Sequence, residues 1–365
     1  MTPPLLFVSG EYPPDVGGVG DYTAQLRHAL ASAGWRSRVL TRRQVRHWDA
    51  RALAWLLRAA PREGLVHIQF QAGAFDLLGD VCVMPWLLRR VRPRVRVLTT
   101  FHDVREPYLF PKAGRLRRAA VRFLATTSQA VIAADERDLL ALGGAACRQY
   151  QVPIGPNIAC APGAGYDRAA FRSGLGLDAD ATAVVYFGLL NQSKGLDLLL
   201  DAFDLIAKAR PGARLLLLGG AAGASDPTDR VTAARVRGRL AQLGERVVRT
   251  GWLPPEALSA YLLAGDVALL PYADGASPRR GSLLACAAHG LPIVSTQPAS
   301  QAVADAVHAA PSTPPSLAAA VLEVANDPSL RERLRVAAQG LATRTAWPAI
   351  AAAHIQIYED LRLPS

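Results

Sequence analysis

Cysteine is scarce in this chain, and long apolar runs are missing from it. Its 365 residues include four cysteines, with no Cys-x-x-Cys or Cys/His spacing that would indicate a zinc site. We therefore expect isolated, reduced thiols. No run of about 18 uncharged apolar residues occurs, so no transmembrane helix is expected. The first residues lack a basic start, which argues against a signal peptide and favours a cytoplasmic location.

Lysine is also rare, although the chain is strongly basic. Only Lys112, Lys194 and Lys208 occur, so the net charge of +11 comes almost entirely from arginine. Residues 87–122 concentrate it, with ten arginines and one lysine against two acidic residues. Such a segment can meet an anionic lipid surface or a phosphorylated substrate, or it can be an ordinary solvated face. No nucleic-acid-binding motif accompanies it, so we expect no nucleic-acid partner.

Half of the residues are apolar, and short apolar strands alternate with helical segments along two stretches of the chain. This alternation predicts parallel sheets with helices on both faces. The expected strands are 5–10, 37–42, 65–70, 95–103 and 130–135 in the first stretch, and 183–190, 213–220, 247–253, 267–272 and 292–297 in the second.

Residues 152–165 are rich in proline and glycine, which predicts a linker between the two stretches. We expect an α/β protein with two doubly wound, Rossmann-like domains whose strand ends face a central cleft. The expected parts are an N-terminal domain (1–155), a C-terminal domain (156–346) and a closing helix (347–365) that returns to the first domain.

Three glycines stand between the first expected strand and the first expected helix. In "EYPPDVGGVGDYTAQLRHAL" they are Gly17, Gly18 and Gly20. Glycine lets the backbone approach another group closely, and the helix behind it offers unpaired N–H groups to an anion. A purely structural turn is the other interpretation. The spacing does not fit G-x-G-x-x-G, and no GxxxxGK[ST] loop occurs, so a nicotinamide cofactor and a P-loop are disfavoured.

Two basic groups follow expected strand ends in the second domain. Lys194 lies in the loop of "YFGLLNQSKGLDLLLDAF", where its ammonium can neutralise a phosphate. Arg279 and Arg280 precede Gly281 and Ser282, which open a helix of small residues. Paired guanidinium groups beside a helix N-terminus predict a second anion site.

The order of these features resembles glycosyltransferase family 4, the retaining, sugar-nucleotide-dependent enzymes with a GT-B fold. The stretches that carry the resemblance are "PPDVGGVGDYTAQL", "FGLLNQSKGLDLLLDAF", "GSLLACAAHGLPIVST" and the terminal "WPAIAAAHIQIYEDL". It implies a nucleoside diphosphate sugar donor on the second domain and a hydroxyl acceptor on the first: a lipid-linked saccharide, a polysaccharide or a small metabolite. It also implies retention, no cofactor and no metal, because helix N-termini, Lys and Arg stabilise the leaving diphosphate.

The resemblance also implies roles for particular residues. His102 in "TTFHDV" matches the family's active-site histidine near the transferred sugar, and Lys194 would act with it. Asp21, His67 and Asp103 are candidates on the acceptor side, although Asp21 can equally cap the first helix and Asp103 a turn. The donor diphosphate would be bound by Gly17, Gly18, Lys194, Arg279, Arg280, Gly281 and Ser282.

Three positions depart from the family's pattern. An arginine is usual at Leu189, and two glutamates are usual at Ser277 and Ala285. Asp274 and Ser277 are the remaining candidates for the donor sugar or ribose. The departures leave two alternatives to an active transferase: a non-catalytic sugar-nucleotide-binding relative, or an unrelated two-domain enzyme such as a dehydrogenase or an epimerase. The basic segment favours a peripheral position at the inner membrane face.

Overall fold

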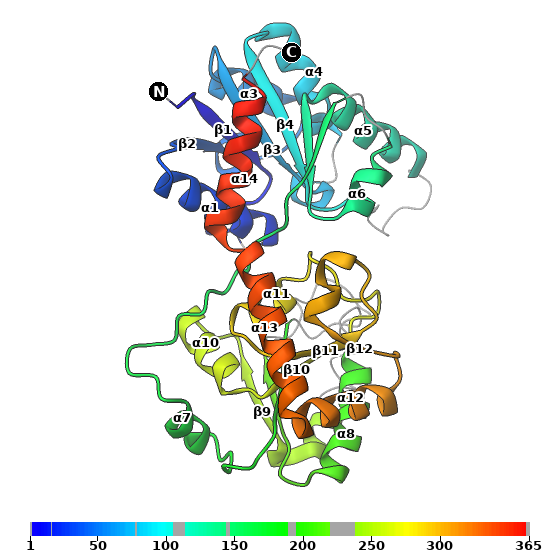
Figure 1. Ribbon diagram of the computed structural model, residues 1–365. Helices are drawn as coiled ribbons and strands as arrows, with labels where there is room; N and C mark the ends of the chain where they lie inside the picture. The colour runs from blue at the N-terminus through cyan, green and yellow to red at the C-terminus, as the bar shows by residue number, and fades with distance from the viewer. Residues whose placement is uncertain are drawn as a thin grey trace. The chain divides into compact units, whose positions relative to one another are not determined.

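The chain divides into two compact units, each described here by itself (Figure 1). Unit 1 comprises Met1–Asn157 and Ala346–Ser365, and unit 2 comprises Ile158–Thr345. The computed structural model describes residues 2–15, 17–76, 79–104, 114–143, 147–188, 195–219 and 238–362, with side chains from 118 onwards in the helix that begins at 114. No helix within these ranges has the length and apolarity needed to cross a membrane.

Unit 1 is built on a parallel sheet of six strands in the order β2-β1-β3-β4-β5-β6. These strands are β1 (Leu5–Ser9), β2 (Ser37–Leu40), β3 (Gly64–Phe70), β4 (Val95–Phe101), β5 (Ala130–Ala133) and β6 (Arg148–Gln151). The helices are α1 (Gly18–Ser32), α2 (Arg42–Val45), α3 (Ala50–Ala59), α4 (Met84–Val91), α5 (Gly114–Thr127), α6 (Glu136–Ala141) and α14 (Trp347–Asp360), with short 3₁₀ turns η1 (Ala72–Phe75) and η2 (Asp80–Val83).

Two apolar cores cover the two faces of this sheet. Side chains alternate along a strand, so Leu5 and Phe7 of β1 enter one core and Leu6 and Val8 enter the other. The first core is closed by α1 and α14, which pack against each other. The second is closed by α3, α4 and α5. The C-terminal helix, red in Figure 1, is therefore an integral part of unit 1.

Unit 2 repeats this plan with a second parallel sheet, ordered β12-β11-β10-β7-β8-β9. Its strands are β7 (Ala183–Phe187), β8 (Arg214–Leu218), β9 (Val247–Gly251), β10 (Val267–Leu270), β11 (Ile293–Thr296) and β12 (His308–Ala310). Its helices are α7 (Arg168–Gly174), α8 (Leu196–Ala209), α10 (Pro255–Ala264), α11 (Gly281–Ala288), α12 (Pro314–Asn326) and α13 (Pro328–Arg344), with 3₁₀ turns η5 (Gly244–Arg246) and η6 (Gln301–Ala306). The two parallel sheets confirm the doubly wound architecture predicted from the sequence.

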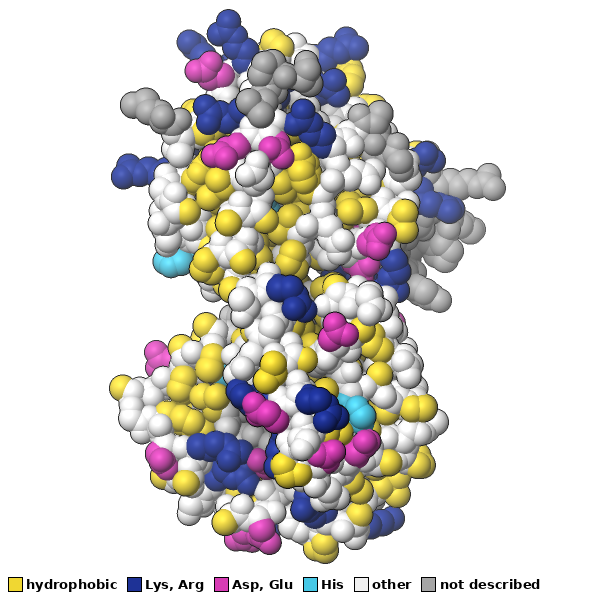
Figure 2. Space-filling view, viewed as in Figure 1, with side chains coloured by type: hydrophobic (Ala, Val, Ile, Leu, Met, Phe, Trp, Pro, Cys, Tyr) yellow, Lys and Arg dark blue, Asp and Glu magenta, His cyan; other side chains and the backbone are white. Residues whose placement is uncertain are grey.

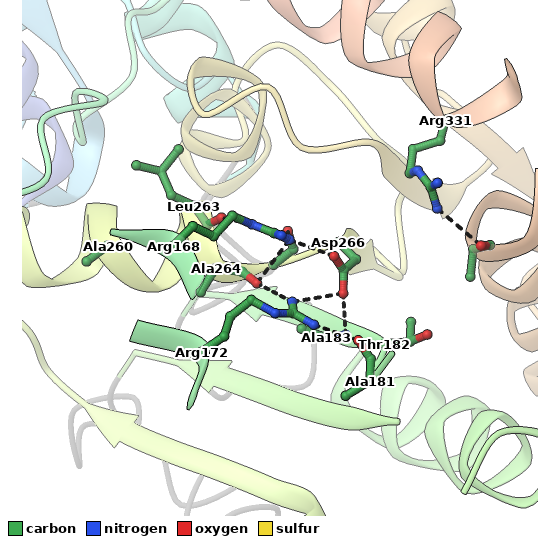
Figure 3. Close-up of polar contacts among 12 residues, drawn as sticks. Arg168, Arg172, Ala181, Thr182, Ala183, Ala260, Leu263, Ala264, Asp266 and Arg331 are labelled. Atoms are coloured by element: carbon green, nitrogen blue, oxygen red, sulfur yellow. Dashed lines mark hydrogen bonds and ion pairs between the residues drawn. The ribbon is translucent and has the colours of Figure 1, made fainter. Parts of the chain in front are cut away.

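An arginine–aspartate network ties α7 to the entering ends of β7 and β10 (Figure 3). Asp266, directly before β10, binds Arg168 at 2.6 Å and Arg172 at 3.0 Å. Its second oxygen also accepts a hydrogen bond of 2.8 Å from the amide of Ala183, the first residue of β7. Arg172 is nearly buried and donates further to the carbonyls of Ala181 and Ala264. This network therefore lies at the N-terminal ends of the strands, opposite to their carboxyl ends.

The start of α1 differs from one sequence expectation. Asp21 does not cap this helix, because the helix begins at Gly18 and its N-cap is Gly17. Asp21 instead lies inside the first turn, exposed, and its amide donates to the carbonyl of Gly17. The physical reason is that the glycine segment itself adopts the helical conformation, with Gly20 packed against the backbone of Tyr12.

Candidate active site

In unit 2, a glycine and several hydroxyl groups lie close together at the carboxyl ends of β7 and β10. Gly188 follows β7 with a positive φ of 149°, a conformation that side chains rarely adopt. A Cβ placed on it would lie 3.8 Å from the hydroxyl of Tyr186 and 3.9 Å from that of Ser282. The hydroxyl groups of Ser282 and Tyr272 share a hydrogen bond of 2.7 Å. Burial raises the pKa of both tyrosines, so their phenols stay protonated and present polar, neutral groups here.

The N-terminus of α11 lies beside these strand ends and lacks a side-chain cap. Arg280 is the N-cap residue, and its side chain makes no cap hydrogen bond to the first turn. A Cβ on Gly281 would meet nothing within 4 Å, so the first turn is accessible to another group. Uncapped N–H groups and the positive end of the helix dipole favour an anion.

Arg280 adds a fixed positive charge to this helix end. Its guanidinium lies 4.8 Å from the ring centroid of Tyr272 and pairs with the exposed carboxylate of Asp274. The ring and the carboxylate together hold the side chain at 15% exposure. Arg280 is also tied to the turn before it, because its amide donates to the carbonyl of Ser277 at 3.1 Å. The structure thus brings together Asp274, Arg280, Gly281 and Ser282.

The other candidates of unit 2 have different settings. Ser277 is 6% exposed, and Ala285 is fully buried inside α11. Arg279 is half-buried, one residue before the helix cap. Lys194 and Leu189 lie outside the described residues. The residue that follows Lys194 is Gly195, the N-cap of α8, where a Cβ would meet the carbonyl oxygen of Pro271 at 1.8 Å. Gly195 therefore anchors the end of that loop beside the end of β10.

The three glycines in the loop between β1 and α1 of unit 1 have different surroundings. A Cβ on Gly17 would lie 1.8 Å from the Glu11 carboxylate, and one on Gly20 would lie 3.0 Å from the Tyr12 amide nitrogen. A Cβ on Gly18 would meet nothing within 4 Å. Packing within the loop therefore accounts for Gly17 and Gly20. Gly18, the first helical residue, leaves the start of α1 open to an approaching group.

His102 follows β4 directly and is joined to the neighbouring strand β3. Its Nε2 is 2.8 Å from Oε1 of Gln69, and its backbone amide donates to the carbonyl of Phe70 at 2.9 Å. The ring of Tyr22, from α1, meets the imidazole edge-on at 4.8 Å. Burial, and then the nearby His354, lower the pKa of His102 to about 3. The imidazole is therefore neutral at physiological pH and acts through hydrogen bonds rather than as a cation.

His67 is not at a strand end, as the sequence suggested, but inside β3. It is fully buried, with Nδ1 at 2.8 Å from the hydroxyl of Tyr358 and Nε2 at 2.7 Å from that of Thr100. The physical reason is that α14 covers this face of the sheet. Burial holds the pKa of His67 well below its ordinary value. Asp103 follows His102 and is half-buried.

The sequence analysis missed Gln69, Thr100, Tyr272 and Tyr358. A signal for the first two was present, because "VHIQF" places polar residues at alternate positions and "VLTTF" places two consecutive threonines in otherwise apolar strands. That pattern marks polar side chains on a buried face, where each needs a hydrogen-bond partner. Among the described residues, no three His, Cys, Asp or Glu side chains are grouped so as to hold a metal ion.

Comparison with known proteins points to one activity. Residues 181–327, within unit 2, match the family described as "Glycosyl transferases group 1". A D-inositol 3-phosphate glycosyltransferase of Jonesia denitrificans is 25% identical over 403 residues, which cover 96% of this chain and 92% of that protein. A protein of the same name from Segniliparus rotundus is 35% identical over 107 residues, which cover 29% of this chain and 23% of that protein.

Solved structures share the fold over the full length of the chain. Sucrose-phosphate synthase from Thermosynechococcus elongatus has a TM-score of 0.74 at 20% identity, covering 99% of each chain. HepE from Anabaena, solved with UDP and glucose, has a TM-score of 0.71 at 17% identity, covering 98% of this chain and 99% of that one. The matched domain and the curated relatives make this chain a glycosyltransferase, and its two parallel sheets give it the GT-B fold.

Proposed function

We propose that this protein transfers a sugar from a nucleoside diphosphate sugar to a hydroxyl acceptor, with retention and without a metal ion. The observation that carries the proposal is the uncapped N-terminus of α11, with the Arg280 guanidinium held beside it. Similar proteins support the substrate class, since HepE was solved with UDP and glucose and two relatives are named D-inositol 3-phosphate glycosyltransferases.

The chemistry explains why an anion site serves this reaction. The bond between the anomeric carbon and the diphosphate oxygen breaks, a bond to the acceptor oxygen forms on the same face, and the acceptor hydroxyl loses its proton. Negative charge therefore grows on the leaving diphosphate. The N–H groups of Gly281 and Ser282, with Arg279, Arg280 and Lys194, stabilise that charge more strongly in the transition state than in the bound donor. Gly17 and Gly18 are proposed to contribute from unit 1.

His102 acts on the sugar as a neutral hydrogen-bonding group. An imidazole with a pKa near 3 is too weak a base to keep a proton at neutral pH. Its contribution is to orient a donor hydroxyl. Asp274 and Ser277 are proposed for the donor sugar or ribose, and Asp21 and Asp103 for the acceptor.

An arginine is expected at Leu189 from the resemblance, so we propose that the remaining basic residues bind the diphosphate in its place. Arg280 is now paired with Asp274, an exposed carboxylate. An ion pair with one exposed partner is weak, so exchanging that carboxylate for a phosphate costs little. Arg280 can therefore bind the donor without a buried charge being left unpaired.

Calorimetric titration with nucleoside diphosphates tests this proposal. UDP, GDP and ADP are titrated into wild type, with NAD and the free nucleosides as comparison ligands. We expect one diphosphate to bind, and Arg279→Ala with Arg280→Ala to weaken it by about 10- to 100-fold, the equivalent of lost charge-assisted hydrogen bonds. The matched control is Arg335→Ala, an exposed arginine of α13. Binding of NAD alone, or of no diphosphate, would contradict the proposal.

Retention has its own readout. Once a donor is found, the anomeric configuration of the first-formed product is read by proton NMR. The proposal requires the product to keep the configuration of the donor sugar. An inverted product would leave the donor class intact and refute retention.

We also propose that unit 1 rests against an anionic membrane surface. Trp55 of α3 and Trp86 of α4 are 41% and 42% exposed, although both are large and apolar. Arg58 and Arg90 lie over these rings, at 5.7 Å and 5.2 Å from the centroids. Figure 2 shows Lys and Arg side chains over the end of unit 1 where α3 and α4 lie in Figure 1. We call these four residues the Trp/Arg face.

A further inference from the structure

Four buried polar side chains lie in unit 1 between the sheet and α14. They are His67 and Gln69 of β3, Thr100 of β4 and Tyr358 of α14, all at most 4% exposed. A buried polar group costs about 1–3 kcal/mol when it has no partner. Four such side chains in one place are therefore expected to hydrogen-bond to one another, and apolar packing alone does not explain their presence.

Strand geometry places these groups on one face. Residues alternate along a strand, so His67 and Gln69 share a face of β3 while Thr100 and His102 share that of β4. The register pairs Gln69 with Thr100 across the two strands. The same face carries the apolar core closed by α1 and α14. The polar residues thus form a line through that core towards His102.

The line is continuous in hydrogen bonds. The hydroxyl of Tyr358 is 2.8 Å from Nδ1 of His67. Nε2 of His67 is 3.0 Å from the amide nitrogen of Gln69, and Thr100 Oγ1 is 2.7 Å from the same Nε2. The amide oxygen of Gln69 is 2.8 Å from Nε2 of His102.

Each position in the line fixes the proton of the next. With the Gln69 amide in this orientation, its nitrogen donates to Nε2 of His67, so the His67 proton sits on Nδ1 and is donated to the Tyr358 oxygen. The amide oxygen of Gln69 can only accept, so His102 donates from Nε2. Nδ1 of His102 is then an acceptor position that makes no hydrogen bond with the residues the structure describes.

We infer that Gln69 is a positioning residue that holds His102 in the Nε2–H tautomer, and that Tyr358 of the C-terminal helix supports this arrangement through His67. The inference rests on the proposed role of His102 in transfer. It also gives α14 a function beyond core packing. In a neutral histidine the choice of tautomer decides which ring nitrogen accepts and which donates, so the line selects what His102 offers to a substrate.

The surroundings keep the line neutral. His354 of α14 lies 5.6 Å from His67, ring centroid to ring centroid, and its Nδ1 contacts the carbonyl of Ile350 at 2.9 Å. Burial lowers the pKa of His354 to about 4. Two fully buried imidazoles and the half-buried one of His102 disfavour a cation on any of them, so each stays neutral over the neutral pH range.

Histidine NMR and kinetics together test the inference. ¹⁵N-labelled histidine spectra of the full chain report the tautomer of His102, assigned with His102→Gln. We expect the Nε2–H tautomer in wild type and a tautomer mixture in Gln69→Leu. In transfer assays, Gln69→Leu should lower kcat about tenfold with the donor KM little changed, the rate equivalent of one hydrogen bond. Tyr358→Phe should shift both readouts in the same direction by less.

Two further variants supply a control and a test of the pKa of His102. Tyr150→Phe is the matched control, because the Tyr150 hydroxyl also contacts α14, at Asp360 and 3.3 Å, yet lies outside the line. It should change neither readout. Gln69→Glu puts a carboxylate beside His102, whose described titratable neighbours include Tyr22, His67, Asp103 and His354, and should raise the pKa of His102.

The outcomes separate the inference from the proposed function. The Nδ1–H tautomer or a mixture in wild type would overturn the positioning role, as would an unchanged kcat in a folded Gln69→Leu. Full activity in His102→Ala would instead refute the catalytic role of His102. Absence of transfer from every donor would refute the proposed function, while the NMR measurement still decides the tautomer.

Discussion

In the glycine loop of unit 1, packing explains two of the glycines, whereas the third has open space beside its Cα. Gly20 lies against the backbone of Tyr12, and Gly17 lies against the movable carboxylate of Glu11. Partial burial in the loop raises the pKa of Glu11. Gly18 has free space where a Cβ would stand. Only Gly18 therefore keeps a feature that packing within the loop does not explain.

Two alanine substitutions separate these roles. Gly20→Ala brings a Cβ to 3.0 Å from a backbone nitrogen, so we expect a loss of about 1–2 kcal/mol in unfolding free energy after the gain in helix propensity is included. Gly18→Ala should change stability by less than about 0.5 kcal/mol while weakening the binding of the nucleoside diphosphate sugar. Urea denaturation and calorimetry measure the two effects. Equal binding by Gly18→Ala and wild type would remove Gly18 from the donor site.

The sequence identified His102 but not its supporting residues, for a physical reason. His102 stands at a strand end within a motif, where a local pattern marks it. Gln69 is 33 positions from His102 and reaches it only because β3 and β4 pair, and Tyr358 is 291 positions from His67 and reaches it only because α14 returns to the first sheet. No local pattern encodes that contact. The same limit applies to Tyr272, whose ring supports Arg280 only after the turn between them has folded.

At the scale of elements, the sequence predicted all the central strands and two of the four edge strands, β2 and β9. The ten expected strands correspond to β1 to β5 and β7 to β11. The two that were missed, β6 and β12, lie at the ends of the two sheets. β6 reads Arg-Gln-Tyr-Gln and is largely exposed, because an edge strand has one unpaired side and less cover. Apolar periodicity therefore cannot reveal it.

Element boundaries around the expected linker were also approximate. The sequence placed the division after residue 155 and before 347, whereas the compact units meet after 157 and before 346. The segment between β6 and α7 has neither strand nor helix. Trp347 packs on Gly155, where a Cβ would lie 2.6 Å from its ring, and its indole N–H donates to the carbonyl of Pro156. This contact holds the first turn of α14 against the segment that follows β6.

The network around Asp266 should be a main source of stability in unit 2 (Figure 3). Asp266→Ala removes two ion pairs and an acceptor for the Ala183 amide, and it leaves the nearly buried Arg172 without its carboxylate. We expect a loss of about 2–4 kcal/mol in unfolding free energy, below the value for a fully buried pair because Asp266 is 26% exposed. Urea denaturation measures it.

A surface pair of the same chemistry is the control. Glu332 and Arg335 form an exposed pair on one face of α13, so Glu332→Ala should leave the urea midpoint unchanged. If Asp266→Ala were as mild as Glu332→Ala, the network would be a surface feature rather than a structural one. Nucleoside diphosphate binding should survive in folded Asp266→Ala, since Asp266 lies at the opposite strand ends from Arg280.

Across the whole molecule, the charge of +11 is distributed unevenly. Residues 87–122 hold eleven basic residues against two acidic ones, and the described part of this segment includes the exposed Arg89 and Arg90 of α4 and the exposed Arg94 after it. Charge alone would indicate only a solvated, basic surface. The Trp/Arg face adds two exposed indole rings, which favour the interface between lipid headgroups and acyl chains. The combination of both features is what suggests a membrane surface.

Vesicle flotation tests this association in the full-length protein. We expect binding to vesicles with about 30% anionic lipid at low salt, reduced at high salt because screening weakens attraction between exposed charges. Trp55→Ser with Trp86→Ser should abolish the part that persists at high salt, while Arg58→Gln with Arg90→Gln should weaken binding at low salt by about 1 kcal/mol per arginine. Trp252→Ser is the matched control, since Trp252 of unit 2 is 80% exposed and lies outside the Trp/Arg face. Equal binding to neutral vesicles, or binding that ignores salt, would show that the basic segment is only a solvated surface.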